Sequence, residues 1–390
     1  MWLKIVSYTP DALKVTWGNG RGTHPTVYHI GRETLQQAAD DARAALSRLV
    51  EWSRTRDENA LPPILRAIAA SGRKLKFVLF DPMMQELREP IARLSEWINE
   101  QRANGDNELI VSTDGSFYVP WSILFDGAVP ADQDKCEIEA FAEFWGLRYD
   151  LTALFEGIVP EGALSPRPRD NFTLFSILNR HENYASCKSL DDEELSCLND
   201  FLDIRIPPQS PDLSRSVFTS EAAEKILSEI RNRNVLFHFF GHGAGNRLIL
   251  ADDDYIELNQ YKLMLDQLSP RTGDRASRTY SLVFLNACET GFGALDNSFF
   301  VGTARQGICG YIGCEAKVPR DFAIRFGLDF LTCLVGYGLP VRDTMSWLRK
   351  KHWPLGLLYG CYSYLDYRIE HPSPPKGAVA IDLPAQPPLT

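Results

Sequence analysis

Two apolar runs, each ending abruptly in a motif of glycine and polar residues, most constrain how this chain can fold. The run VLFHFF (235–240) continues into GHG, and the run LVFL (282–285) continues into NACETG. Runs this apolar are typical of strands buried on both faces of a parallel sheet. Because loops with reactive groups gather beyond the carboxyl ends of such strands, we expect His242 and Cys288 to meet at one edge of the sheet.

A cysteine beside a histidine can break an amide bond. The thiolate is the nucleophile, and the imidazole carries the proton to the leaving amine. The glycines on either side of His242 let the backbone come close to a substrate. The amides of Gly243 and Cys288 are the candidates for binding the oxyanion. His242 precedes Cys288 by 46 positions. In caspases too the histidine comes before the cysteine, and the interval is about 50 residues.

The rest of the chain predicts a mixed α/β fold. Its first half predicts short antiparallel strands and helices, and its second half alternates strands and helices, as in a mainly parallel sheet covered on both faces. The glycine-rich stretch 18–22 is read as a hairpin turn rather than a phosphate loop. The expected strands are 3–6, 13–17, 26–30, 76–80, 109–111, 172–178, 235–240, 282–285 and 308–314. The expected helices are 35–50, 60–71, 83–103, 191–202, 219–230, 321–335 and 340–351.

A stretch rich in proline and glycine, 159–171, marks a boundary. We expect a supporting region over 1–165, the main unit over 166–370, and a proline-rich disordered tail over 371–390.

Composition excludes several classes of function. The net charge of −10 argues against a nucleic-acid binder, and no apolar run approaches the roughly 20 residues of a spanning helix. The 8 cysteines include no C-x-x-C pair, so they predict core residues in a reducing compartment rather than a zinc ribbon. We therefore predict a cytoplasmic protein with no membrane contact, no metal and no organic cofactor.

Specific segments resemble a known family. HFFGHG (238–243) and LNACETG (285–291) are similar to the two motifs of the CHAT family, caspase-like cysteine peptidases related to separase. The segments 111–127 and 305–349 resemble the regions before and after the family's peptidase core. The resemblance implies a caspase-like unit preceded by a degenerate, pseudo-caspase one. It assigns His242 as general base and acid, and Cys288 as nucleophile. The chain departs from the commoner family pattern at 315–318, which puts the substrate pocket in doubt.

Three acidic residues, Glu289, Glu315 and Asp321, are candidates for binding substrate, and two of them have an ordinary alternative. Glu289 either shapes the pocket or bonds loop amides. Asp321 either contacts substrate or caps a helix after Pro319. In related enzymes, acids near Glu315 and Asp321 receive a basic residue, so we predict cleavage after Arg or Lys. The loop 269–279 would then be a processing site, or else an ordinary connector.

His238 raises the question of a metal, because it precedes His242 by four positions. That spacing aligns ligands on a helix but separates them by about 13 Å along a strand, so we interpret His238 as a core residue.

Three hypotheses follow. The first is a cysteine endopeptidase that makes limited, regulatory cuts in a protein substrate, with a role in antiviral defence and activation by a partner protein. The second is a catalytically inactive caspase-like scaffold that binds proteins. The third is a metal-binding protein that uses His238, His242 and Cys288.

Overall fold

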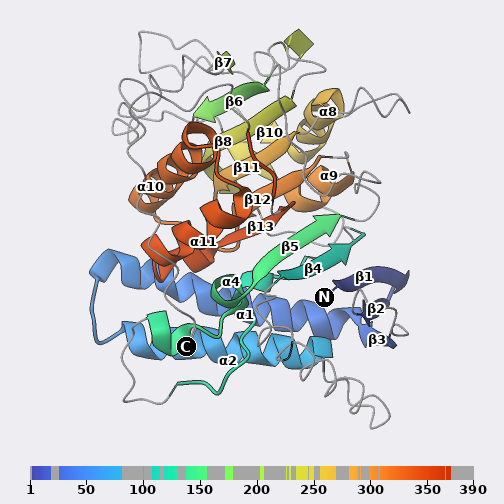
Figure 1. Cartoon of the computed structure of the whole chain (residues 1–390), viewed down its shortest axis with the longest axis vertical. Coiled ribbons are helices and arrows are strands. Elements are labelled where there is room, and N and C mark those ends of the chain that lie inside the picture. The colour runs from blue at the N-terminus through green and yellow to red at the C-terminus, as the bar shows by residue number, and fades with distance from the viewer. Residues whose placement is uncertain are drawn as a thin grey trace.

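The structure is a computed structural model. It describes most of the chain in segments: 2–18, 26–80, 100, 108–114, 118–130, 138–155, 172–178, 203–205, 225, 228–229, 234–244, 246–249, 255–268, 281–288, 290, 298–305, 308–364 and 366–369. Two mixed sheets with flanking helices make up these residues (Figure 1).

The first sheet has the strand order β3-β2-β1-β4-β5. An antiparallel meander of β1 (Trp2–Thr9), β2 (Ala12–Gly18) and β3 (Thr26–Gly31) continues through parallel β4 (Glu108–Thr113) and β5 (Asp150–Phe155). Buried and partly buried residues alternate along the start of β1, the pattern of a strand with one face on the core. The four strands predicted at 3–6, 13–17, 26–30 and 109–111 are confirmed, whereas β5 was not predicted.

Two long helices accompany this sheet, α1 (Arg32–Thr55) and α2 (Leu61–Phe80). The predicted apolar face of α1 is buried throughout, and the same face also buries a charged residue, Arg43. The predicted strand at 76–80 is wrong, because α2 continues to Phe80. Leu75 and Leu79, four residues apart, are buried while Phe77 is 53% exposed, so the run keeps a helical period that five apolar residues alone cannot reveal.

The second sheet contains the two motif strands at its centre. Its strands run β7-β6-β8-β11-β12-β13, and β9 and β10 extend it from the end of β8. Four of these strands match predictions: β6 (Phe172–Leu178), β8 (Asn234–Ala244), β11 (Leu282–Ala287) and β12 (Gly310–Cys314). The others are β7 (Asp203–Arg205), β9 (Arg247–Ile249), β10 (Tyr255–Glu257) and β13 (Tyr359–Ser363). β6, β7, β8, β11 and β12 are parallel, and β13 is antiparallel.

Helices cover both faces of the second sheet (Figure 1). One face carries α10 (Arg320–Leu331) and α11 (Val341–Lys351), joined by the π-helical turn η6 (Thr332–Gly336). The other carries α8 (Leu258–Leu268) and α9 (Phe299–Arg305). The predicted helices 321–335 and 340–351 are confirmed. The prediction of a mixed α/β, caspase-like sheet covered by helices agrees with this architecture.

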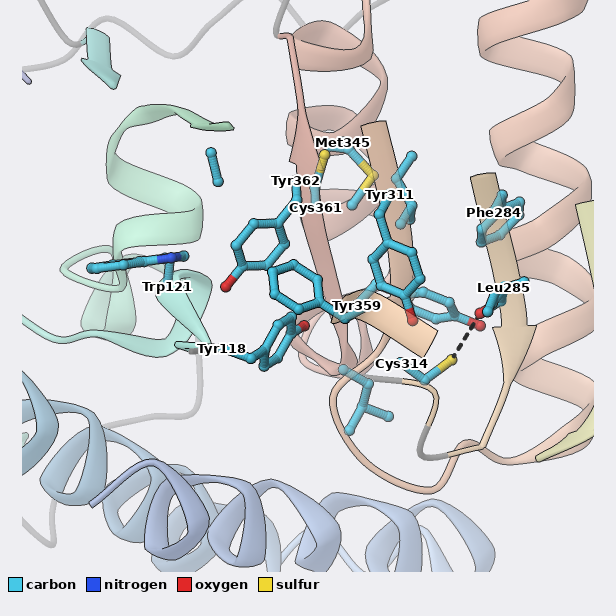
Figure 2. Close-up of a cluster of buried hydrophobic side chains, with 14 of the residues drawn as sticks. Tyr118, Trp121, Phe284, Leu285, Tyr311, Cys314, Met345, Tyr359, Cys361 and Tyr362 are labelled. Carbon is cyan, nitrogen blue, oxygen red and sulfur yellow. Dashed lines mark hydrogen bonds between the residues drawn. The ribbon is translucent and has the colours of Figure 1, made fainter. Parts of the chain in front are cut away.

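The two sheets meet where β5 lies beside β13 (Figure 1). The segment between β4 and β5 packs into this junction with η2 (Trp121–Ile123), η3 (Ile138–Phe141) and α4 (Trp145–Arg148). Figure 2 shows the aromatic cluster there: Tyr118 lies against Tyr362 of β13, with ring centroids 4.9 Å apart. A short 3-10 turn, η7 (Leu355–Leu358), leads into β13.

Several predictions fall outside the described residues. These are the hairpin turn at 19–22, the helix at 191–202, nearly all of the helix at 83–103, the boundary stretch 159–171, the loop 269–279 and the tail 371–390. Of the predicted helix 219–230, positions 225, 228 and 229 are described, and they are helical.

Candidate active site

The strand register brings the histidine and the cysteine to one edge of the sheet. β8 and β11 are parallel neighbours, and the last matched pair is Gly241 with Ala287. His242 and Cys288 are the next residues on each strand, so both leave the sheet at the same level. His242 is exposed and Cys288 is half-buried. This is the arrangement that the two apolar runs predict.

A pocket opens over this edge, with about 300 Å³ of space including the part open to solvent. His242 and Cys288 line this pocket. Val318, Arg320 and Ala323, from the loop after β12 and the first turn of α10, also line it. A solvent-open hollow beside an imidazole and a thiol is a suitable place for a substrate carbonyl.

Gly243 has a steric reason to be glycine. A Cβ at this position would lie 2.2 Å from the backbone oxygen of Cys288, far inside van der Waals contact. The histidine motif and the cysteine motif therefore touch through their backbones. No larger residue fits at 243 without moving one strand end from the other.

The sulfur of Cys288 contacts the loop that follows β12. The amide of Val318 donates to the Cys288 Sγ at 3.5 Å, and the Cys288 thiol donates to the Val318 carbonyl at 3.8 Å. The N–H favours the thiolate because it hydrogen-bonds to the charged form, whereas the carbonyl favours the neutral thiol. The position of Val318 thus bears directly on the reactivity of the thiol.

Asn286 fastens the end of β11 to the covering helix. Its side-chain amide donates to the carbonyl of Ala323 in α10 at 2.8 Å, and its oxygen accepts from the Tyr359 hydroxyl at 2.5 Å. Gly327 makes room for this contact, since a Cβ there would lie 2.6 Å from the Asn286 nitrogen. Asn286 is buried with both ends of its amide satisfied, so it fixes the strand two residues before Cys288.

Thr290 closes the turn that carries Cys288. Its hydroxyl lies 3.1 Å from the carbonyl of Ala287 and 3.3 Å from that of Leu285, and it accepts from the Cys314 amide at 3.2 Å. Its carbonyl accepts from the Tyr311 hydroxyl at 2.7 Å. These bonds tie the turn to both β11 and β12.

Glu315 lies in the interior and away from the pocket, which is at odds with the prediction that it contacts substrate. Its side chain is fully buried. It accepts a hydrogen bond from Tyr118 and forms an ion pair with Arg43, Nε to Oε2 at 3.6 Å. A carboxylate held this way cannot reach a substrate in solvent. Burial raises the pKa of Glu315 to about 7, against the opposing effect of Arg43.

The other two acidic candidates are placed differently. Asp321 is in the first turn of α10, with its side chain 79% exposed, and pairs with Arg320 at 3.6 Å. The N-cap of α10 is Pro319, so the alternative interpretation, in which Asp321 caps the helix, is wrong. Glu289 lies outside the described residues.

His238 is a core residue, as predicted. It is 2% exposed and stacks on Phe284 with ring centroids 5.1 Å apart. Burial lowers its pKa to about 3, so it is neutral at physiological pH. In the part of the chain that the structure describes, no group of three or more His, Cys, Asp or Glu residues is placed to hold a metal ion.

Two further predicted core residues are confirmed. Cys314 is fully buried in β12, and Cys309 is buried just before it. Burial raises the pKa of the Cys314 thiol well above its ordinary value. Of the described cysteines, Cys288 is therefore the one with partial exposure.

Sequence analysis related the segment 315–318 to the substrate pocket but did not single out Val318, Arg320 or Ala323 as residues that line it. Val318, Arg320 and Ala323 carry no motif of their own, because a loop valine and the first turn of a helix look ordinary in sequence. The available signal was Pro319, which marks where the loop ends and α10 begins.

Comparison with known proteins bears on this fold. No protein-family model matches the chain, and no curated protein matches its sequence. Two crystal structures of the separase–securin complex from Saccharomyces cerevisiae are similar to it. One has a TM-score of 0.52 at 10% identity and covers 95% of this chain. The other has a TM-score of 0.50 at 12% identity and covers 94%.

The similarity defines the class of fold first: a mixed α/β, caspase-like architecture of two sheets flanked by helices. The particular likeness is to separase, and this chain spans 30% of the length of the matched chains. At this identity the likeness concerns the fold. Among the described residues, no helix is both long and apolar enough to cross a membrane.

Proposed function

We propose that this chain is a cysteine endopeptidase of the CHAT caspase-like type, with Cys288 as nucleophile and His242 as general base and acid. The observation that carries the proposal is the register of β8 and β11, which sends both residues off the same sheet edge beside a solvent-open pocket. The partial exposure of Cys288, among described cysteines that are otherwise buried, supports it.

The chemistry divides into two steps. The His242 imidazole takes the proton of the Cys288 thiol as the sulfur bonds to the carbonyl carbon of the scissile amide. The C–N bond then breaks, and the amine leaves with that proton. Water, deprotonated by the same imidazole, then attacks the thioester and releases the acid and the thiol. In each step the developing oxyanion is bound by the amides of Gly243 and Cys288, a contribution whose loss costs about 100- to 1,000-fold in rate.

The proposed substrate is a particular protein, cut at few sites. Regulatory cleavage, with a role in antiviral defence and activation by a partner protein in the cytoplasm, is what the CHAT resemblance implies. The similar structures are of separase in a complex with securin, which supports a function that involves protein partners. Exposed Asp321 is our candidate for binding a basic residue of the substrate. Glu315 is not a candidate, because its side chain is fully buried.

The experiment is coexpression of the chain with each candidate partner protein, followed by a search for a shortened fragment. The native chain should produce the fragment, and both Cys288→Ala and His242→Ala should not. Cys333→Ala, a fully buried cysteine in η6, and His29→Ala, an exposed histidine in β3, are the matched controls and should cut normally.

The second candidate is a caspase-like scaffold that binds proteins without cutting them. Under this alternative the same solvent-open pocket would hold a segment of the partner without cutting it. Under this alternative, a partner would copurify equally with the native chain and with Cys288→Ala, and neither would shorten it.

A further inference from the structure

A buried ion pair joins the N-terminal helix α1 to the loop beside the candidate nucleophile. Glu315 follows β12 directly, and its amide donates to the Leu358 carbonyl at 2.8 Å. Its carboxylate is fully buried between Tyr118 and Arg43. Gly360 leaves room for the Glu315 carboxylate, because a Cβ at position 360 would lie 2.2 Å from the carboxylate oxygen. The site for this carboxylate is therefore built from α1, β13 and the segment between β4 and β5.

Arg43 is built to meet it. The side chain is 3% exposed, although it belongs to a surface helix of the N-terminal region. Its guanidinium donates to the Tyr118 carbonyl at 2.9 Å and to Asp40 at 3.1 Å, and lies 5.0 Å from the centroid of the Tyr118 ring. Figure 2 shows the same Tyr118 packed into the aromatic cluster of the second sheet. Arg43 and Glu315 thus meet across the junction of the two sheets.

Three buried charged side chains lie at this junction, Arg43, Glu315 and Arg349. Asp40, which is 47% exposed, also pairs with Arg43. Arg349 of α11 is itself buried and donates to the carbonyls of Gly146 and Tyr359. A buried carboxylate that loses its cation is strongly unfavourable, so it takes up a proton or moves toward water. Removing Arg43 would therefore leave Glu315, and the backbone that bears it, without the ion pair that holds it in this position.

That backbone leads straight to the nucleophile. Val318 follows Glu315 by three residues, and its amide donates to the Cys288 sulfur at 3.5 Å. On the far side the loop is held by Pro319, the N-cap of α10, while Ala323 accepts from Asn286. The segment 315–318 is thus a short bridge between two fixed ends, and a shift at Glu315 displaces Val318.

We propose that Arg43 is a positioning residue for the Cys288 thiol: by neutralising Glu315 it fixes the loop 315–318, which holds the Val318 amide against the sulfur. The inference rests on the proposed function for its biological meaning. It makes the N-terminal region a working part of the site, so that a partner that displaces α1 would also change the reactivity of Cys288.

The test is the rate at which iodoacetamide alkylates Cys288 in the whole chain, read from the Cys288 peptide by mass spectrometry. The alkylation measurement needs no substrate, so it is informative even if no cleaved partner is found. Conversely, a native alkylation rate in the Arg43 variant would not refute the peptidase proposal, which the cleavage experiment tests. Arg43→Met should slow alkylation at neutral pH by about tenfold, the effect of about 1.4 kcal/mol between coupled residues.

Two variants separate positioning from general loss of stability. The double variant Arg43→Met with Glu315→Gln carries neither charge, so its rate should return toward the native value. Arg148→Met is the matched control, because Arg148 is also buried and ion-paired, with Asp126 and Glu143 in the N-terminal half. It should lower the melting temperature without slowing alkylation. A native rate in Arg43→Met would overturn the proposal, as would equal slowing in Arg148→Met.

A conservative pair guards against a variant that does not fold. Arg43→Lys keeps the positive charge, and Arg43→Gln keeps a donor for the Tyr118 carbonyl without the charge. We expect alkylation of Cys288 near the native rate with lysine and slowed with glutamine. Equal rates in the two would mean that the charge of Arg43 does not position the loop.

Discussion

Gly243 and the backbone carbonyl of Cys288 are in such close contact that a Cβ at 243 would lie 2.2 Å from that oxygen. The contact joins the ends of β8 and β11 at the point where His242 and Cys288 leave the sheet. It explains the glycine of the histidine motif by packing, independently of any role for its amide in binding an oxyanion.

Gly243→Ala should therefore separate the two motifs. We expect a loss of about 1–3 kcal/mol in the free energy of unfolding, as for other overpacked positions. We also expect slower alkylation of Cys288, because the two strand ends move apart. Urea unfolding and alkylation rates measure the two effects. Gly302→Ala in α9 is the control: its Cβ would meet the flexible Lys262 side chain at 3.3 Å, and alanine is the better helix former. Two variants with equal stability and equal alkylation would refute the steric account.

Thr290→Val tests the turn that carries the nucleophile. Valine keeps the shape but removes the hydroxyl that accepts from the Cys314 amide, leaving a buried donor unsatisfied at a cost of about 1–3 kcal/mol. We expect lower stability and slower alkylation of Cys288. Thr344→Val, at a buried threonine of α11 whose hydroxyl has no hydrogen-bond partner among the described residues, should cost much less, and the account fails if its cost is the same.

Stability should depend on pH through Glu315. Its pKa is raised from 4.5 to about 7 by burial, so between these values the folded chain binds more protons than the unfolded chain. Stability from this group is then full below about pH 4.5 and falls as the pH rises through about 7. The total change is about 3 kcal/mol at 1.36 kcal/mol per pKa unit. The charged and titratable groups around Glu315 are Arg43, Arg349, Tyr118, Tyr362, Tyr311 and Cys314.

Urea unfolding of the native chain and Glu315→Gln across this pH range checks the prediction. The native chain should lose stability relative to the variant as the pH rises. Glu257→Gln, at a carboxylate 44% exposed in β10, is the control and should show no such trend. A constant difference between native and Glu315→Gln would mean that Glu315 does not titrate in this range.

Substrate preference tests Asp321. A panel of short fluorogenic peptides should be cut after Arg or Lys, and Asp321→Asn should weaken that preference because it removes the carboxylate that receives the basic side chain. Asp343→Asn is a closely matched control, since Asp343 lies in the first turn of α11 and pairs with its neighbour Arg342 at the same 3.6 Å. Preference for Asp or for an aliphatic residue would refute the prediction.

Much of the fold was accessible from sequence where local patterns are strong. The alternation of β1, the long apolar face of α1 and the continuous apolar runs of β8 and β11 each identified their element. The short strand β13, YGCYS, was missed, because its five residues form neither a continuous apolar run nor an alternating pattern. Run length and polarity thus located the centre of the second sheet better than its edge.

The candidate site was predictable only where its residues follow a strong local pattern. His242 and Cys288 stand out because each follows an apolar strand, and parallel strands deliver their ends to one edge. The environment of Glu315 could not be seen, since its partner Tyr118 is 197 positions away and Arg43 looks like any charged residue of a surface helix. A local pattern says what a residue is able to do, whereas its long-range neighbours decide whether it faces substrate or interior.

The central claim is that the His242 imidazole activates the Cys288 thiol. The most direct measurement is the alkylation rate of Cys288 at neutral pH in the native chain, His242→Ala and the control His29→Ala. We predict a loss of about 100-fold in His242→Ala, the lower end of the range for a positioned general base, and none in His29→Ala. Equal rates in all three chains would contradict the account.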